Sequence, residues 1–145
     1  MLFDYLKAEY IPQIAEIEKE CFSIPWSEQA FTEELSSPYA RYFVALSGSQ
    51  VAGYIGLHTI LDEAYITNIA VRRTCREHGL GRSLMRSAIL YCKHKSCSFV
   101  SLEVRKSNRV AIHLYETFGF TVMGTRRKYY SCPVEDAYIM TLTLP

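Results

Sequence analysis

The chain has 145 residues, of which 49% are hydrophobic and 21% are charged, and its formal net charge is +1. This length suits one domain with a full hydrophobic core and is too short for two domains of ordinary size, so we expect residues 1–145 to form a single domain. The near-neutral charge excludes a strong electrostatic preference for nucleic acid or for anionic lipid. We therefore expect no direct nucleic-acid binding and look for partners at individual sites.

The sequence shows no signal for export, membrane insertion or metal binding. Its first residues lack a basic segment followed by a long apolar stretch, and no segment approaches the roughly 18 apolar residues of a membrane span. The five cysteines form no CxxC pair, and the four histidines lack partners at ligand spacing. These patterns argue against a disulfide framework and against a metal site. We expect a soluble, cytoplasmic protein that binds no membrane and no metal.

Hydrophobic periodicity predicts a mixture of strands and helices. In chain order we expect a strand at 2–5, helices around 14–21 and 27–35, a hairpin of strands 42–46 and 51–60, a strand at 64–71, a helix at 80–92, a strand at 99–104, a helix at about 108–118, and strands at 120–130 and 137–144. Ser27 is the expected cap of the second helix. Residues 65–104 read as a β-α-β unit, which predicts an α/β fold with one parallel strand pair.

The segment 65–83 combines a strand, a basic loop with two glycines and the start of a helix. The first N–H groups of a helix have no intrahelical partner and carry partial positive charge, so they attract anions. Gly79 and Gly81 would let a phosphate approach the backbone without a Cβ in the way. This geometry favours a cradle for a nucleotide-derived cofactor.

The motif in this loop runs from Arg76 to Gly81 as R-x-x-G-x-G. It is not a dinucleotide fingerprint, because Leu84 stands where a third glycine would be, and it is not a Walker loop, because no Gly-Lys-Ser/Thr follows. The flanking Arg82 adds positive charge. The alternative is that the glycines only form a turn between strand and helix.

Glu103 is a carboxylate inside a strand whose neighbours Val100, Leu102 and Val104 occupy the opposite face. It lies near the carboxyl end of a parallel strand, where open α/β sheets place their ligands. We expect burial at this position to make the carboxylate a better proton acceptor, as a general base requires. The alternative is a glutamate at a sheet edge or in an ion pair.

Tyr115 lies on the apolar stripe of the following helix, where a core tyrosine is the ordinary interpretation. A phenol that faced the same crevice as Glu103 would instead supply a proton, because it is mostly protonated at neutral pH. Ser107 is the expected N-cap of this helix, which would leave Asn108 free to reach a ligand; alternatively Asn108 itself caps the helix.

The residues named above occur in motifs that resemble one known family. The chain is similar to the Gcn5-related N-acetyltransferases over nearly its whole length, and the resemblance is strongest to the bacterial branch that acetylates the N-terminal alanine of a small-subunit ribosomal protein. The matching segments are 25–27, 61–64, 68–71, the Arg76 to Gly81 loop, 102–108, 114–120, 126–130 and 135–137. The loop is shared by the whole family, whereas Glu-Val-Arg-x-Ser-Asn and Glu-Asp-Ala are narrower.

The resemblance implies a mixed central sheet of about six to seven strands flanked by about four helices, with acetyl-CoA as cosubstrate at the β-α-β unit. It assigns the proton acceptor to Glu103 and the proton donor to Tyr115, with direct transfer and no acyl-enzyme. The residues that it assigns to acetyl-CoA are Ile69, Ala70, Val71, Arg76, Glu77, His78, Gly79, Leu80, Gly81, Arg82 and Asn108. Arg73 replaces a proline and Arg76 replaces a glutamine that are common in relatives.

The acceptor is the least determined part of the prediction. The resemblance implies the flexible N-terminus of a ribosomal protein, with a path that would be lined by Trp26, Asp62, Glu63, Glu135 and Asp136, although these could equally be core or solvated surface. The alternatives are other protein N-termini, lysines or a small-molecule amine. A non-catalytic acetyl-CoA-binding interaction module is the alternative of another class, and the oligomeric state stays open.

Overall fold

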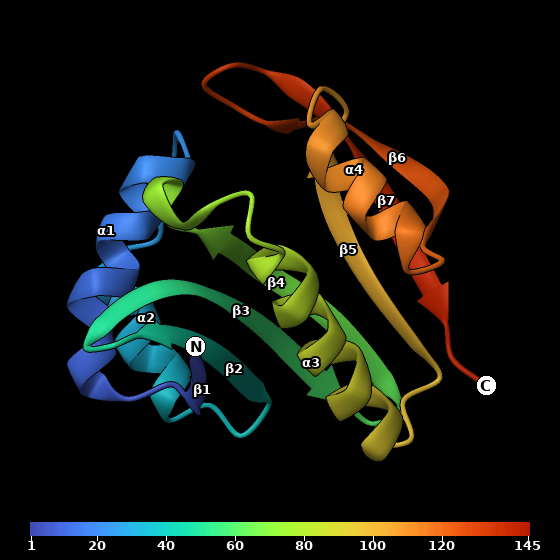
Figure 1. Cartoon of the computed structure of the whole chain (residues 1–145). Helices are drawn as coiled ribbons and strands as arrows, with labels where there is room; N and C mark the ends of the chain where they lie inside the picture. Colours follow the sequence, from blue (N-terminus) through green and yellow to red (C-terminus); the bar gives the residue numbers. More distant parts are fainter.

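A seven-stranded mixed sheet with strand order β1-β2-β3-β4-β5-β7-β6 forms the centre of the protein in the computed structural model, which describes residues 1–145 (Figure 1). The strands are β1 (Leu2–Tyr5), β2 (Ala40–Ser47), β3 (Gln50–Ile60), β4 (Glu63–Val71), β5 (Phe99–Arg105), β6 (Thr121–Tyr130) and β7 (Glu135–Thr143). The helices are α1 (Ile11–Cys21), α2 (Glu28–Leu35), α3 (Leu80–His94) and α4 (Arg109–Thr117), with short 3-10 turns at η1 (Ala8–Tyr10) and η2 (Arg73–Cys75). Each element predicted from the sequence is present.

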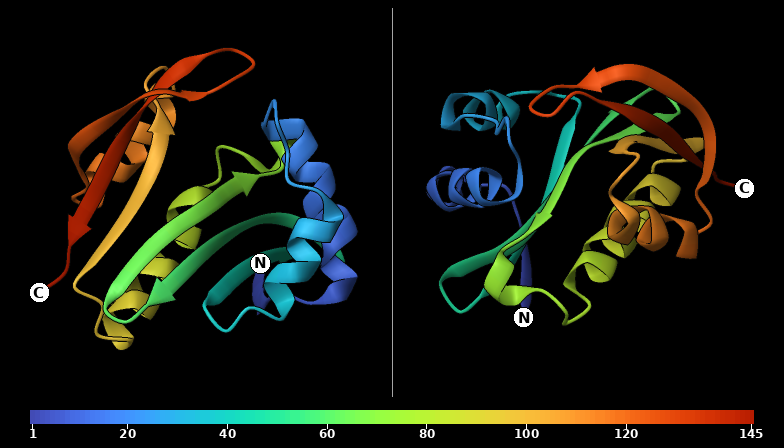
Figure 2. Two further views of the ribbon diagram at one scale, coloured as in Figure 1. Left: turned by 180° about the vertical axis from the view of Figure 1, so that it is seen from behind. Right: turned by 90° about the horizontal axis from the view of Figure 1, so that it is seen from above.

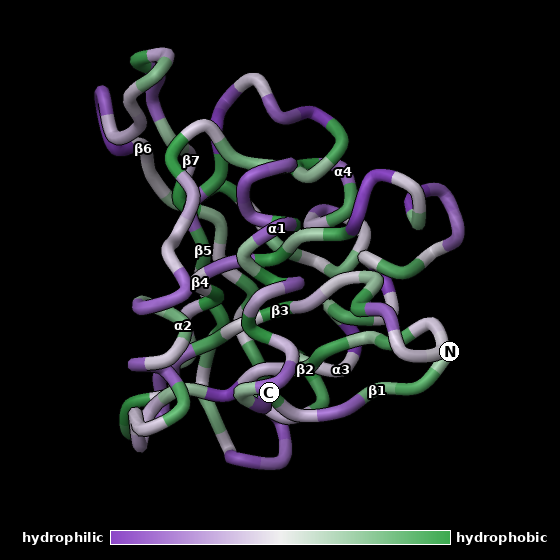
Figure 3. Tube along the Cα trace, turned by 90° about the vertical axis from the view of Figure 1, so that its left-hand side faces the viewer, coloured by the Kyte–Doolittle hydropathy of each residue, from purple (hydrophilic) through white to green (hydrophobic).

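Helices cover both faces of the sheet. In Figure 2, α1 and α2 lie on one face and α3 and α4 on the other. The first pair packs on a buried cluster that includes Ile14, Ile17 and Phe31, and α2 begins at the predicted cap, where the Ser27 hydroxyl accepts a hydrogen bond from the Ala30 N–H at 3.1 Å. A larger cluster lies under α3 and α4. Figure 3 shows the corresponding pattern, with hydrophobic chain through the middle and hydrophilic chain mainly in the outer loops.

The parallel pair between β4 and β5 is short. Its register covers only three positions, ending where Tyr65 lies opposite Ser101, and the two strands then separate (Figure 1). Thr67 is left without a partner by a register shift against β3, and such a bulge bends a strand. The consequence is a divergence between β4 and β5 in the middle of an otherwise continuous sheet.

Beyond the divergence, β7 pairs with β5 along the whole length of β5, and β6 forms the outer edge. Two register shifts interrupt the pairing of β6 with β7, and most residues of β6 are exposed. Irregularities of this kind make an edge strand a poor template for further pairing. The chain between β6 and β7 projects from the sheet at the end where β4 and β5 have separated (Figures 1 and 2).

Candidate active site

The carboxyl end of β4 presents backbone groups that β3 does not use. The Arg72 N–H donates to the Ala52 carbonyl at 2.7 Å, so Ala70, two residues earlier, has the same orientation toward β3. Successive residues of an antiparallel strand point their N–H and C=O groups alternately toward and away from the partner. Ile69 and Val71 therefore direct theirs toward the side where β5 has diverged, as an extended ligand would require.

The loop before α3 ends in a row of free amide donors. The backbone N–H groups of residues 77–82 donate no hydrogen bond within the protein, and the first bond at this end runs from the Ser83 N–H to the Gly79 carbonyl at 3.1 Å. Gly79 caps α3 in the left-handed region with φ of 75°, without a side-chain cap. A Cβ at Gly81 would meet only Leu114 Cδ2, at 3.6 Å, so the space in front of the amides is open. This arrangement fits a diphosphate.

The arginine side chains of the loop have partners within the protein. Arg76 donates from Nε to the Val71 carbonyl and from Nη2 to Cys21 Sγ, both at 3.1 Å. Arg82 donates from Nη2 to Thr117 Oγ1 at 3.2 Å, and its Cζ lies 5.3 Å from the centroid of the Phe118 ring. The cradle is therefore made by backbone amides, while the two guanidinium groups fix the loop and α3 to neighbouring elements.

Both departures from the family pattern have a structural role here. The Arg73 N–H donates to Glu20 Oε2 at 3.1 Å, and its Nη2 donates to the Glu20 carbonyl at 3.2 Å. A proline at this position has no N–H and could not make the first bond. Together with the Arg76–Cys21 contact, these bonds hold the loop to the end of α1.

Glu103 lies two residues beyond the last position at which β5 pairs with β4, on the face opposite Leu102 and Val104, which are buried as predicted. Its Oε1 accepts a hydrogen bond from Arg126 Nε at 3.1 Å, and its side chain is 31% exposed. The expected burial of this carboxylate is therefore wrong, and the ion-paired arrangement is the one observed. The reason is that no helix covers this face of the sheet at β5, β7 and β6 (Figure 2).

Tyr115 is 5% exposed and packs in the core under α3 and α4, with its ring centroid 5.9 Å from that of Phe120. Burial raises the pKa of its hydroxyl above the ordinary value, and the nearby Tyr130 phenol raises that pKa further. The hydroxyl makes no hydrogen bond within the protein. Tyr115 packs in the same cluster as Leu102 and Val104, so Glu103 and Tyr115 lie on opposite faces of β5.

Tyr130, the last residue of β6, belongs to the matching segment 126–130 and interacts electrostatically with both of these groups. It is half-buried, and burial raises its pKa to about 12; Glu103 contributes to that shift, just as Tyr130 contributes to the raised pKa of Tyr115. The end of β6 therefore contributes a phenol that influences the protonation of both groups.

The N-cap of α4 is Asn108, not Ser107. Asn108 Oδ1 accepts a hydrogen bond from the Ala111 N–H at 3.2 Å, whereas the Ser107 N–H and hydroxyl donate to Glu135 at 2.7 and 3.0 Å. Since its Nδ2 has no partner within the protein, Asn108 caps the helix and still has donors to offer a ligand.

A buried carboxylate near the site escaped the sequence analysis. Glu18 of α1 is 2% exposed and accepts hydrogen bonds from the Tyr54 hydroxyl at 2.5 Å, the Trp26 N–H at 3.0 Å and Asn68 Nδ2 at 3.3 Å. It joins α1, the α1–α2 loop and the bulged part of β4. Its spacing from Ile14 and Cys21 places it on the apolar stripe of the helix, and that is the signal that could have identified it.

Of the four acidic residues expected to line a peptide path, two are in ion pairs and two lie away from the divergence of β4 and β5. Glu135 pairs with Arg105 at 3.2 Å, and Asp136 pairs with Lys106 at 3.5 Å. Asp62 lies in the turn before β4, and Glu63 is the first residue of β4, where the strand still pairs with β5. None of these four carboxylates stands free at the divergence.

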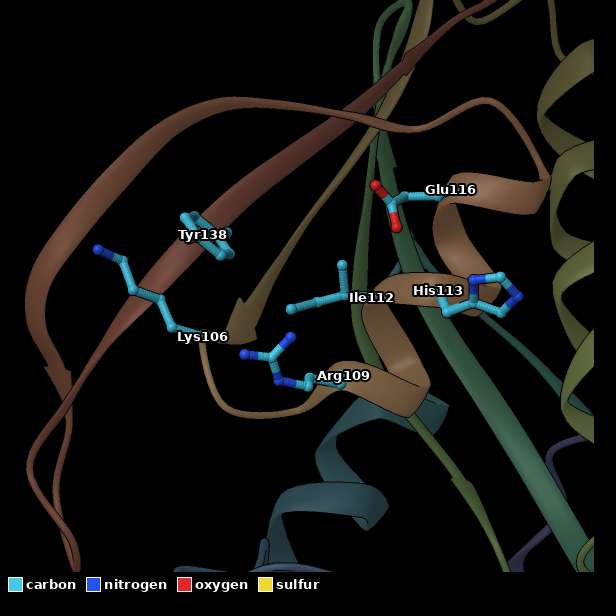
Figure 4. A pocket seen from close by; sticks show the side chains of 6 residues that line it. All are labelled: Lys106, Arg109, Ile112, His113, Glu116 and Tyr138. Carbon is cyan, nitrogen blue, oxygen red and sulfur yellow. The ribbon is translucent and has the colours of Figure 1, made fainter.

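Two surface concavities lie outside this region. One, of about 280 Å³, is lined by Trp26, Ala30, Glu33 and Glu34, and Trp26 also stacks on Phe31 with ring centroids 5.4 Å apart. The other, of about 390 Å³, is lined by Lys106, whose Nζ lies 5.1 Å from the centroid of the Tyr138 ring, by Tyr138 itself, and by Arg109, Ile112, His113 and Glu116 along α4 (Figure 4). Neither is lined by Glu103 or Tyr115.

No group of three or more His, Cys, Asp or Glu side chains is placed to hold a metal ion. None of the helices is long and apolar enough to cross a membrane.

Comparison with known proteins agrees with this geometry. Residues 11–120 match the model of the Acetyltransferase (GNAT) family. A Bacillus subtilis (strain 168) protein provisionally designated a ribosomal protein bS18-alanine N-acetyltransferase is 42% identical over 96% of this chain and 93% of its own. The Escherichia coli (strain K12) ribosomal protein bS18-alanine N-acetyltransferase is 35% identical over 96% of this chain and 95% of its own.

The fold is equally close to solved structures. The crystal structure of the ribosomal-protein-S18-alanine N-acetyltransferase from Escherichia coli superimposes with a TM-score of 0.90 and 33% identity, covering 98% of this chain and 92% of that one. The chain has the amide cradle before α3 and the strand divergence beside it, and the family model matches most of its length. This chain therefore belongs to the GNAT acetyltransferase family.

Proposed function

We propose that this acetyltransferase transfers an acetyl group from acetyl-CoA to the N-terminal alanine of ribosomal protein bS18. The observation that carries the proposal is the similarity to relatives of that designation, at 42% and 35% identity over 96% of this chain. Fold likeness alone would not select an acceptor, because unrelated functions share folds. The similarity covers nearly all of this chain and nearly all of each relative, so the relatives consist of the same single domain.

The residues that would hold acetyl-CoA are the backbone groups of β4 and of the loop before α3. The amides of residues 77–82 would bind the diphosphate, and the outward backbone groups of Ile69 and Val71 with the Asn108 amide would bind the pantetheine arm, whereas the backbone groups of Ala70 face β3. Arg76 holds the Val71 carbonyl, so the Val71 N–H is the group free for this purpose. The bound cosubstrate supplies an acetyl group activated as a thioester.

The chain's own side chains then manage the protons. Glu103 takes a proton from the acceptor ammonium, directly or through water, and the free amine forms a C–N bond with the acetyl carbon as the C–S bond breaks; the amide nitrogen then releases its extra proton to water. Tyr115 gives its proton to the departing sulfur, and its raised pKa keeps it protonated until that moment. The outward N–H groups at the end of β4 stabilise negative charge on the acetyl oxygen.

The chemistry of the amine favours an N-terminal acceptor. An α-amino group has a pKa of about 7.7–8.0 and a lysine about 10.4, so deprotonating the lysine near neutral pH costs about 3.5 kcal/mol more. One carboxylate that is partly exposed and ion-paired, as Glu103 is, suits the smaller task. Direct transfer is also favoured over a cysteine-bound acetyl group, because no cysteine lies in a hydrogen bond with a histidine base.

A peptide panel tests the proposal. Release of CoA is followed with hexapeptides that begin with Ala, Ser or Met, with the same Ala peptide blocked by acetylation, and with polyamines. Turnover confined to the free N-terminal Ala peptide supports the proposed acceptor. Turnover of the blocked peptide through lysine, of other N-termini or of polyamines would move the activity to another amine. Cofactor binding without transfer to any amine would leave a binding module.

A further inference from the structure

Arg105, the last residue of β5, contacts the chain on both sides of the strand divergence. Its Nη1 donates to the Pro133 carbonyl at 2.9 Å, and its Nη2 donates to the Ser131 carbonyl at 3.0 Å and to Ser23 Oγ at 3.5 Å. Its Cζ also lies 4.4 Å from the centroid of the Tyr130 ring. One guanidinium group thus joins the β6–β7 turn (residues 131–134) to the α1–α2 loop (residues 22–27).

Glu135 extends the same cluster toward the cofactor side. Its Oε1 accepts from Arg105 Nη1 at 3.2 Å, and its two oxygens accept from the N–H and hydroxyl of Ser107, the residue before the Asn108 cap of α4. These bonds lower the pKa of Glu135, with the Ser107 hydroxyl as the largest cause. The β6–β7 turn is therefore fixed to the β5–α4 turn as well.

The position of the two joined segments matters for the acceptor. Figures 1 and 2 both show the β6–β7 turn and the end of α1 above the ends of β4 and β5, on either side of the divergence. We take the acceptor to approach Glu103 from this end of the sheet, beside both segments. β6 is largely exposed, and the register shift after Arg126 leaves residues 127–129 without ladder partners, so only the Tyr130–Glu135 pair and the bond from the Lys128 N–H to Asp136 join the two strands next to the turn.

We propose that Arg105 is a positioning residue for the acceptor peptide: it holds the β6–β7 turn against the α1–α2 loop and, through Glu135, against the β5–α4 turn, so that the peptide meets a preformed passage. Arg105 touches no reacting atom in this scheme. A planar guanidinium with several directional donors suits the task, and a lysine cannot reproduce it. The inference rests on the proposed function only in taking the acceptor to be a peptide.

Loss of this cluster should affect peptide use selectively. In Arg105→Gln we expect KM for the Ala hexapeptide to rise by about tenfold, because part of the binding free energy is then used to order the turn. We expect KM for acetyl-CoA to change by less than about twofold and kcat at saturating peptide by less than about threefold, because ground-state binding is what the change removes. Arg105→Lys should resemble Arg105→Gln.

Lys106→Gln is the matched control, since it removes the neighbouring cation and its pair with Asp136 without touching the turn. All of its kinetic constants should stay within about twofold of wild type. Glu135→Gln, which keeps the shape but removes the charge, should raise peptide KM by about threefold and provides a second route if Arg105→Gln folds poorly.

Peptide binding to the CoA-loaded protein, measured by calorimetry, is the readout independent of turnover. A weaker peptide Kd with an unchanged CoA Kd supports the inference; an unchanged peptide Kd, or equal losses for both ligands, overturns it. If the panel identifies a different peptide acceptor, the same comparison is made with that peptide. Failure of the bS18 proposal and failure of the Arg105 proposal are thus separate results.

Discussion

Nε of Arg126 donates a hydrogen bond to Oε1 of Glu103 over 3.1 Å, so the edge strand β6 reaches the proposed base on β5 across the intervening β7. Both side chains are partly exposed, at 54% and 31%. An ion pair with this exposure contributes only about 0–1 kcal/mol to stability. The pair therefore orients the carboxylate more than it holds the fold together.

This relationship separates a catalytic from a structural role for Glu103. We expect Glu103→Gln to lower kcat by about 10²-fold or more, while Arg126→Gln keeps turnover within about tenfold of wild type. Both variants should change the free energy of unfolding by less than about 1 kcal/mol. Steady-state kinetics and urea denaturation check this, and equal losses of kcat in both variants would assign the effect to the ion pair.

The Tyr115 hydroxyl offers a test in which stability and activity diverge. It has no hydrogen-bond partner in the protein, so Tyr115→Phe should change the free energy of unfolding by less than about 1 kcal/mol. The loss of the proton donor should lower kcat by about 10²-fold.

The raised pKa of Tyr115 also predicts the alkaline side of the pH profile. Because burial disfavours the phenolate, the hydroxyl stays protonated through its ordinary value and loses its proton only above it. The kcat of the wild-type enzyme should therefore not fall on account of Tyr115 up to about pH 10. A descending limb below that pH which Tyr115→Phe abolishes would contradict the assignment.

The two loop glycines should respond differently to alanine. At Gly81 the new Cβ meets no protein atom closer than 3.6 Å and φ is not positive, so stability should be unchanged or rise by about 0.5–1 kcal/mol. At Gly79, φ of 75° makes alanine cost about 1–2 kcal/mol. Calorimetry with CoA should nevertheless show binding to Gly81→Ala weakened by about tenfold, because the methyl group stands before the amides. Unchanged binding would mean that no diphosphate lies there.

The order of the elements and the cofactor loop could be predicted from the sequence because their signals are local. Periodicity fixes helices and strands, and a glycine loop between strand and helix presents amides wherever it occurs. Ser27 at the start of α2 is a further local signal that the structure confirms.

The misjudged features depend on contacts between distant segments. Ser107 and Asn108 are equally suitable caps, and the choice is made by Glu135, which engages Ser107 from β7. Strand alternation gave the face of Glu103 correctly, but not the partner that β6 supplies on that face. Such pairings depend on the strand order, which follows from tertiary packing.

Glu18 shows what a buried carboxylate contributes to the site. Because three donors depend on its two oxygens, Glu18→Gln should lower the free energy of unfolding by about 2–4 kcal/mol. Glu16→Gln on the same helix, where the side chain is 67% exposed, should cost less than about 0.5 kcal/mol. Urea denaturation followed by the fluorescence of Trp26, the only tryptophan, measures both. Similar small losses would show that the network is dispensable.

The most direct test of the account is to incubate purified bS18 with acetyl-CoA and either the wild-type enzyme or Glu103→Gln, and to locate the acetyl group by peptide mass spectrometry. We predict a single acetyl group on the α-amino group of the N-terminal alanine with the wild type, and none above background with the variant. Acetylation confined to lysines, or undiminished acetylation by Glu103→Gln, would contradict the proposed acceptor or the proposed base.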